Sequence, residues 1–206
     1  MLLIVAIDVG IKNLGYCAIR SEPSKLVYEV IEWANEQLTE GSYQPMKNVD
    51  YIQSFVQRHA HLLEEAQLIV IERQMRVNMR IIEAVLHALH YDRCIVVPAR
   101  TIKAHYGLCM RNYRLNKLAA VDHVHKLLES TRSDWLPFFV SARKKDDLAD
   151  AFLMAHFFST QATTSNSQPA CPKTQVVSET MTTSATSPTM NAPPPSTASS
   201  TSISVI

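Results

Sequence analysis

The chain has 206 residues, enough for one domain of ordinary size with additional sequence beside it. No stretch approaches the roughly 18 consecutive apolar residues of a membrane span, and the first residues lack the basic start of a signal peptide. The net charge is +1 and the four cysteines show no paired or metal-type spacing, which predicts a soluble intracellular protein in a reducing compartment, with Cys17 and Cys94 as buried free thiols.

The first part of the chain has the pattern of three successive strands. Residues 1–8 form an apolar run that ends in Asp8, which is typical of a strand buried on both faces. Gly10 and Asn13 both tolerate the backbone of a turn. Further strands are predicted at residues 14–20 and 26–33, so that two hairpins in succession give an antiparallel meander.

Helical patterns and short apolar runs alternate after the meander. Helices are predicted at residues 47–66, 75–91, 99–106, 114–129 and 146–158. Strands are predicted at residues 68–72 and 94–97. This order resembles that of the ribonuclease H-like fold, and the resemblance implies an α/β fold with a five-stranded mixed sheet of three antiparallel and then two parallel strands, flanked by helices. In that fold the first strand is central and the fourth lies beside it.

The composition changes near Thr160. From there to the end Ser, Thr, Pro and Ala dominate, and Lys173 and Glu179 are the only charged side chains. Too few large apolar residues are present to offset the entropy of ordering such a segment. We therefore expect one folded domain over residues 1–158 and a disordered tail over residues 159–206, with a Pro-rich linker or interaction segment as the alternative for the tail.

Charge is divided unequally along the predicted domain. Residues 20–72 hold four Lys and Arg against nine Asp and Glu, whereas residues 73–145 hold fourteen Lys and Arg against five Asp and Glu. A basic half favours a polyanionic partner such as nucleic acid. The alternative is a solvated basic face without a ligand.

Acidic residues lie at the ends of elements that otherwise have buried patterns. Asp8 and Glu72 end two apolar strands, and Asp147 and Asp150 share one face of the last helix. Charge beside a core is costly unless it is compensated, and divalent cations compensate carboxylates with oxygen ligation. The pattern predicts a metal-dependent phosphoryl-transfer enzyme. Each acid also has an explanation without a metal: Asp8 can cap a turn, and Glu72 can lie at an exposed strand end. The helix dipole favours acids in a first helical turn, which accounts for Asp146 and Asp147 better than for Asp150.

The helix at residues 75–91 is apolar on two sides, which is too wide for one buried stripe. We expect it to pack on its own sheet and on a second subunit; a central helix covered on all sides is the alternative. Histidines such as His59 and His61 are two residues apart and point away from each other on a helix, so they are interpreted as surface or packing residues.

Three segments together carry a family resemblance: residues 7–15, 71–74 and 144–151. With them the chain resembles the RuvC-type Holliday junction resolvases, most of all those of poxviruses and related large-DNA viruses and their fungal mitochondrial relatives. The similarity covers residues 1–158, and its most specific part is Lys144, Lys145, Asp146 and Asp147 followed by Asp150.

The resemblance implies a site with assigned roles. Asp8, Glu72, Asp147 and Asp150 would hold two Mg²⁺ ions, with Mn²⁺ as a substitute, and Lys117 would assist catalysis; a metal contact from Asp146 stays open. The residues expected to bind nucleic acid are Lys12, Asn13, Arg73, Arg76, Lys103, Arg114, Lys144 and Lys145.

The same resemblance implies a structure-selective DNA endonuclease. It would resolve four-way junctions by paired symmetric nicks in recombination and concatemer processing, as a homodimer through helix 75–91, and in a virus it would act where viral DNA is replicated. One alternative is a nuclease of the same fold acting on RNA or an RNA–DNA hybrid. A non-catalytic DNA-binding module is another, against which the four acids argue. A nucleotide-binding protein of the actin and Hsp70 type needs a second Gly-rich loop, which four glycines do not provide.

Overall fold

The centre of the fold is a five-stranded sheet in a computed structural model that describes residues 1–22, 27–131 and 133–161. The strands are β1 (Leu2–Asp8), β2 (Leu14–Glu22), β3 (Val27–Glu36), β4 (Leu68–Glu72) and β5 (Cys94–Val97). Their order is β3-β2-β1-β4-β5. β1, β2 and β3 pair antiparallel, whereas β4 pairs parallel to both β1 and β5. This confirms the predicted mixed sheet, with β1 central and β4 beside it.

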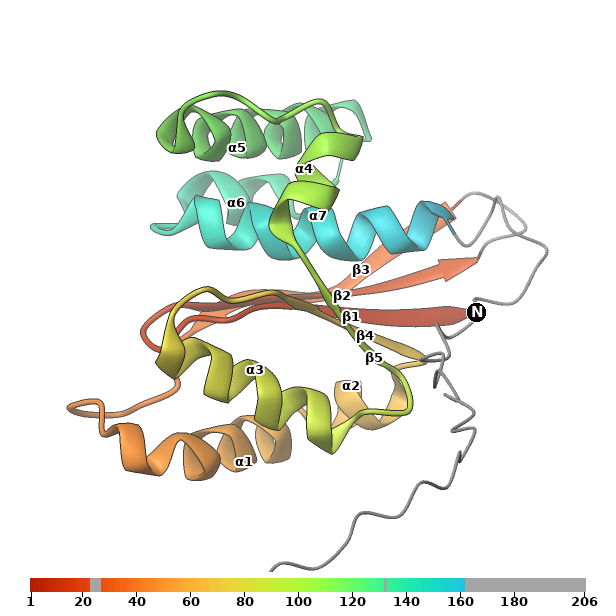
Figure 1. The fold of residues 1–206 in the computed structure, drawn as a ribbon. Coiled ribbons are helices and arrows are strands. Elements are labelled where there is room, and N and C mark those ends of the chain that lie inside the picture. Colours follow the sequence, from red (N-terminus) through yellow and green to blue (C-terminus); the bar gives the residue numbers. More distant parts are fainter. Residues whose placement is uncertain (23–26, 132, 162–206) are drawn as a thin grey trace, which may run out of the picture. The chain divides into compact units, whose positions relative to one another are not determined.

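Helices cover both faces of the sheet (Figure 1). One face carries α1 (Asn48–Arg58), α2 (Ala60–Glu65) and α3 (Val77–Leu89). The other face carries α4 (Ala99–His105), α5 (Tyr113–Ser130), α6 (Leu136–Ser141) and α7 (Lys145–Gln161). A short 3-10 turn, η2 (Pro45–Lys47), precedes α1.

Strand β1 is buried on both faces, as its apolar run predicts. Ile4 and Ala6 belong to the core beneath α7, whereas Leu3, Val5 and Ile7 belong to the core beneath α1 and α3. Side chains alternate between the faces of a strand, so Asp8 falls on the α7 side together with Ile4 and Ala6. The buried free thiols Cys17 and Cys94 were also predicted correctly.

Several element boundaries differ from the prediction. The single helix expected at 47–66 is wrong, because the helix is interrupted at His59, which ends α1 and precedes α2. Helix α6 was not predicted, and β3 continues three residues beyond the predicted end, to Glu36. The helix expected at 75–91 is shorter, Val77–Leu89.

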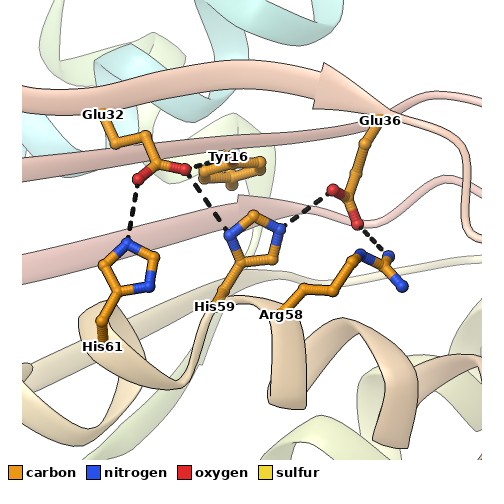
Figure 2. Close-up of polar contacts among 6 residues, drawn as sticks. All are labelled: Tyr16, Glu32, Glu36, Arg58, His59 and His61. Carbon is orange, nitrogen blue, oxygen red and sulfur yellow. Dashed lines mark hydrogen bonds and ion pairs between the residues drawn. The ribbon is translucent and has the colours of Figure 1, made fainter.

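A polar network surrounds the junction between α1 and α2 (Figure 2). The buried His59 ring lies between two carboxylates of β3, with Nε2 2.9 Å from Glu36 Oε2 and Nδ1 3.5 Å from Glu32 Oε1. Tyr16 donates a hydrogen bond to Glu32 at 2.5 Å, and Arg58 donates one to Glu36 at 2.6 Å. His59 is therefore a buried polar bridge between the sheet and the helix junction.

Helix α7 continues to Gln161, three residues past the predicted domain boundary. The rest of the predicted tail lies outside the described residues. Within the described ranges, no helix has both the length and the apolar character needed to cross a membrane.

Candidate metal centre and its cleft

Three carboxylates converge at one end of the sheet. Asp8 ends β1 and Glu72 ends β4, and these strands are parallel neighbours with Ile7 opposite Ile71. Helix α7 packs on the same face and brings Asp150. One carboxylate oxygen from each of Asp8, Glu72 and Asp150 lies within 4.8 Å of the other two. Among residues 1–22, 27–131 and 133–161, this is the one group of three or more His, Cys, Asp or Glu placed closely enough to share a metal ion.

Asp147, the fourth predicted ligand, lies beside this group without belonging to it. It lines the same cleft as Asp8, Glu72 and Asp150. Its negative charge also raises the pKa of Asp8 and of Glu72. The structure therefore brings three predicted ligands together and places the fourth at their edge.

Burial and mutual repulsion raise the pKa of all four carboxyl groups. Burial is the main cause for each of them. The charges of Glu72 and Asp150 raise the pKa of Asp8 further, and the charge of Asp150 helps raise the pKa of Glu72 to about 7. Such a cluster is costly as anions and favours a bound cation.

The donor set fits a hard divalent cation. All the converging atoms are carboxylate oxygens, which are the ligands that Mg²⁺ and Mn²⁺ prefer. The surrounding charge is negative and partly withdrawn from water, so an ion offsets both burial and repulsion. The group can therefore hold a metal ion through Asp8, Glu72 and Asp150, with Asp147 adjacent.

Lys103 of α4 forms an ion pair with the centre. Its Nζ donates a hydrogen bond to Asp150 Oδ2 at 2.9 Å, and both side chains are only 11% exposed. Burial opposes the charged lysine, but Asp150 outweighs this effect and raises the pKa of Lys103. Lys103 was predicted to bind nucleic acid; here it contacts a predicted metal ligand.

Lys117 of α5 bridges the two aspartates at the start of α7. Its Nζ donates a short hydrogen bond to Asp146 Oδ2 and lies 3.9 Å from Asp147 Oδ1. Burial disfavours the Asp146 carboxylate, but the hydrogen bond from Lys117 outweighs it and lowers the pKa of Asp146. In this structure the Asp146 carboxylate therefore faces Lys117 rather than the group formed by Asp8, Glu72 and Asp150.

An open cleft of about 930 Å³ lies over the carboxylates. Predicted nucleic-acid-binding residues that line it are Lys12, Asn13, Arg73, Arg76 and Lys144. Arg114 and Lys145 do not line this cleft, and Lys103 lines a smaller adjoining pocket with Glu72 and Asp150. The rim is thus basic while the floor is acidic, an arrangement suited to a phosphate backbone over a metal site.

Sequence reasoning did not assign Arg100 or Tyr43 to the site, although both line the cleft. Arg100 follows Pro98 at the start of α4, and Tyr43 lies in the loop before α1. The only available signal for Arg100 was the general excess of basic residues after residue 72.

Gly10 has a local role: a Cβ there would lie 2.1 Å from the carbonyl oxygen of Asn13, so the turn that carries Lys12 and Asn13 requires glycine.

Comparison of the sequence with known families gives one match. The profile of the Poxvirus A22 protein family matches residues 2–160, which includes both strand-end acids and all of the acidic turn of α7. A search of curated proteins found no match.

Several solved structures with a similar fold are junction resolvases. The yeast mitochondrial Holliday junction resolvase Ydc2 is similar with a TM-score of 0.62 and 22% identity, over 77% of this chain and 79% of that one. The fowlpox virus resolvase in complex with substrate Holliday junction DNA is similar with a TM-score of 0.61 and 16% identity, over 78% of this chain and 98% of that one. Thermus thermophilus RuvC in complex with a Holliday junction substrate is similar with a TM-score of 0.53 and 14% identity, over 79% of this chain and 98% of that one. At these identities the similarity concerns the fold.

Proposed function

Because this chain belongs to the Poxvirus A22 protein family, we propose that it is a metal-dependent endonuclease that resolves four-way DNA junctions by paired symmetric nicks. Its cellular role would be the processing of recombination intermediates and concatemers, at the place in the host cell where viral DNA is replicated. The observation that carries the proposal is the group formed by Asp8, Glu72 and Asp150 on the floor of a basic cleft.

The carboxylates provide the binding site for the ions. Asp8, Glu72 and Asp150 would hold Mg²⁺, with Mn²⁺ as a substitute, and Asp147 would extend the set to accommodate two ions. When bound, divalent ions supply an activated water and stabilise charge on the leaving oxygen of a phosphodiester. Two strand ends and one helix turn fix the positions of these carboxylates, so they would hold the ions at one end of the sheet.

Basic residues of the cleft would bind and orient the DNA strand. Lys12, Arg73, Arg76 and Lys144 would contact backbone phosphates, which position a duplex without reading its sequence. Lys117 also lines the cleft and lies 3.9 Å from Asp147 Oδ1, so its ammonium can neutralise charge that develops on the reacting phosphate.

A second copy of the chain is the proposed partner for the outer side of α3. Ile82 and Leu86 pack into the core, whereas Val77, Ile81 and Leu89 are exposed along the same helix. Arg76, directly before α3, lines the cleft. Two symmetric nicks require two sites related by a two-fold axis, and pairing through α3 would link these two clefts.

The direct test is a synthetic four-way junction incubated with the full chain and Mg²⁺. Paired, symmetrically placed nicks are expected from the wild type. Asp147→Asn should bind the junction with unchanged affinity and should not nick it, because the change removes a charge at the edge of the metal centre. Unimpaired nicking by Asp147→Asn would overturn the proposed site.

Cleavage of an RNA–DNA hybrid of matched sequence distinguishes the proposed junction resolvase from the main alternative, a ribonuclease H-type nuclease. A ribonuclease H-type enzyme would cleave the hybrid faster than the junction, whereas the proposed enzyme would prefer the junction. A chain that binds the junction in Mg²⁺ and Mn²⁺ but nicks neither substrate would be a non-catalytic DNA-binding module.

A further inference from the structure

The start of α7 is fixed to the sheet by polar contacts from β3. Trp33 Nε1 donates a hydrogen bond to the carbonyl oxygen of Leu148 at 3.0 Å, and Asn35 Nδ2 donates one to the carbonyl oxygen of Lys144 at 2.8 Å. Trp33 and Asn35 are two residues apart on one strand, so both point to the face covered by α7. The two bonds flank the turn that contains Asp147.

Gly15 of β2 supports the same turn by having no side chain. A Cβ on Gly15 would lie 2.6 Å from the carbonyl oxygen of Asp147 and 3.0 Å from Asn35 Oδ1. Gly15 pairs with Asp8 on one neighbouring strand and with Asn35 on the other. The backbone of Asp147 therefore rests against β2 in the row of residues that begins with Asp8.

We propose that Gly15, Trp33 and Asn35 are positioning residues that hold the first turn of α7 on the sheet and thereby set the metal affinity of the centre. This inference rests on the proposed metal-dependent function. None of the three belongs to the group of converging carboxylates, and each acts on backbone that carries Asp147 or leads directly to Asp150. We call these three residues the α7 cradle.

The geometry explains why small displacements matter. Asp8 and Glu72 are fixed by the sheet, whereas Asp150 reaches the centre from α7. Mg²⁺ demands near-ideal octahedral coordination at about 2.0–2.1 Å. A shift of the helix start by a fraction of an ångström would therefore displace Asp150 and Asp147 from a bound ion without moving Asp8 or Glu72.

Helix α7 has enough other packing to stay folded without any one cradle contact. Its buried residues include Leu148, Ala151, Phe152 and Ala155, which pack in the core beneath the helix. The docking of α7 is therefore dominated by apolar burial. The polar contacts at the start of α7 orient and position its first turn. Their loss should therefore change the metal affinity of the centre more than it changes the stability of the helix.

The test compares two tryptophans that each donate one indole hydrogen bond to a backbone carbonyl. Trp33→Phe removes the bond to Leu148, whereas Trp135→Phe removes the bond from Trp135 Nε1 to Val30, at 3.1 Å, which does not involve α7. Asn35→Leu keeps the approximate size and removes the donor to Lys144. Gly15→Ala adds the clashing Cβ. Mn²⁺ binding by calorimetry and thermal unfolding in EDTA are measured for each full-length variant.

Mutating residues that orient metal ligands typically lowers metal affinity by about 10–100-fold. We expect a loss at the lower end of that range for Trp33→Phe and Asn35→Leu. Trp135→Phe should bind Mn²⁺ like the wild type, even where its unfolding temperature falls by a similar amount. In the nicking assay, saturating Mn²⁺ should restore most of the rate of the cradle variants, because their carboxylates are intact.

The inference is overturned if Trp33→Phe and Asn35→Leu bind Mn²⁺ as tightly as Trp135→Phe, whether or not Gly15→Ala folds. It is also overturned if the wild type binds no Mn²⁺. A wild type that binds Mn²⁺ with the expected cradle dependence but nicks no junction would support the inference and refute the proposed function instead.

Discussion

Lys103 Nζ lies 2.9 Å from Asp150 Oδ2, so a positive charge from α4 is bound directly to one of the three converging carboxylates. The pair raises the pKa of Lys103. The pKa of Asp150 nevertheless stays above its ordinary value, because burial outweighs the attraction to Lys103. The ammonium thus offsets only part of the negative charge of the centre, and a metal ion that binds Asp150 has to compete with it.

Lys103→Met should destabilise the metal-free protein and increase its response to metal. Removing one member of a buried ion pair leaves the other unpaired, and we expect the free energy of unfolding in EDTA to fall by roughly 3 kcal/mol. Mn²⁺ should then raise the stability of the variant more than that of the wild type, because no ammonium competes for Asp150. Urea unfolding in EDTA and in Mn²⁺ measures both effects.

Lys126→Met is the matched control. Lys126 pairs with Asp122 at 2.7 Å, but these side chains are 70% and 63% exposed. An exposed pair of this kind contributes about 0.5 kcal/mol or less. Equal stability of Lys103→Met and Lys126→Met in EDTA would contradict the role given to the buried pair.

Asp146→Asn should slow nicking without changing the dependence on metal. Asp146 accepts the hydrogen bond from Lys117 in this structure, so its loss leaves the Lys117 ammonium less well placed. We expect the single-turnover nicking rate to fall by about 10-fold, which corresponds to about 1.4 kcal/mol in the barrier. The Mg²⁺ concentration that gives half the maximal rate should stay at the wild-type value.

A direct metal contact from Asp146 would give a different result. Asp146→Asn would then require a higher Mg²⁺ concentration for half the maximal rate, as expected for loss of a ligand. Asp150→Asn provides the reference for that behaviour, because its carboxylate belongs to the converging group.

The sequence predicted the acids of the centre better than their partners. Asp8 and Glu72 could be placed together because each ends an apolar strand, and the element order makes those strands parallel neighbours. The acidic turn of α7 was visible from the i, i+3 spacing of Asp147 and Asp150. The pairing of Lys103 with Asp150 was not predictable, because it depends on how α4 lies against α7 rather than on any local pattern.

The α7 cradle and the break between α1 and α2 could not be predicted either, because both involve contacts between residues far apart in the sequence. Asn35 lies in a polar stretch after the predicted end of β3, and its hydrogen bond to Lys144 spans most of the domain sequence. The apolar spacing of α1 and α2 continues through His59, so periodicity alone predicts one helix. The contacts that His59 makes at this break are with Glu32 and Glu36 of another element, and no local sequence pattern indicates them.

Val77→Glu combined with Ile81→Glu should abolish the proposed dimer. Val77 is 75% exposed and Ile81 is 41% exposed, one turn apart on α3. Charges buried without partners in an apolar interface cost several kcal/mol, equivalent to at least about a 100-fold loss of affinity. Sedimentation velocity should then report a monomer, and nicks at a four-way junction should become unpaired.

The exposed apolar residues of α5 provide the comparison for this variant. Leu115 and Leu118 are 53% and 58% exposed, and Leu115→Glu with Leu118→Glu introduces the same charge. That variant should retain the wild-type oligomeric state. A wild type that sediments as a monomer at all concentrations, or an α3 variant that remains dimeric, would refute the assignment of α3 as the interface.

His59→Gln should reduce the pH dependence of stability in the acidic range. Burial disfavours the Glu36 carboxylate, but hydrogen bonds from His59 and Arg58 outweigh burial and lower the pKa of Glu36. Burial also disfavours the Glu32 carboxylate, and hydrogen bonds from Tyr16 and His61 lower the pKa of Glu32 in the same way. A carboxyl group with a lowered pKa in the folded state stabilises the protein above its unfolded pKa of about 4.3, and this contribution is lost as the pH falls through the folded value.

The wild type should therefore lose unfolding free energy between about pH 5 and pH 3 more steeply than His59→Gln, in which a neutral amide replaces the imidazole that contacts both carboxylates. His61→Gln is the control, because the His61 side chain is 62% exposed, whereas that of His59 is 11% exposed. Its pH profile should stay closer to the wild type, since exposed pairs contribute little. Parallel profiles for the wild type and His59→Gln, from urea unfolding at each pH, would show that the buried bridge does not link β3 to the α1–α2 junction electrostatically.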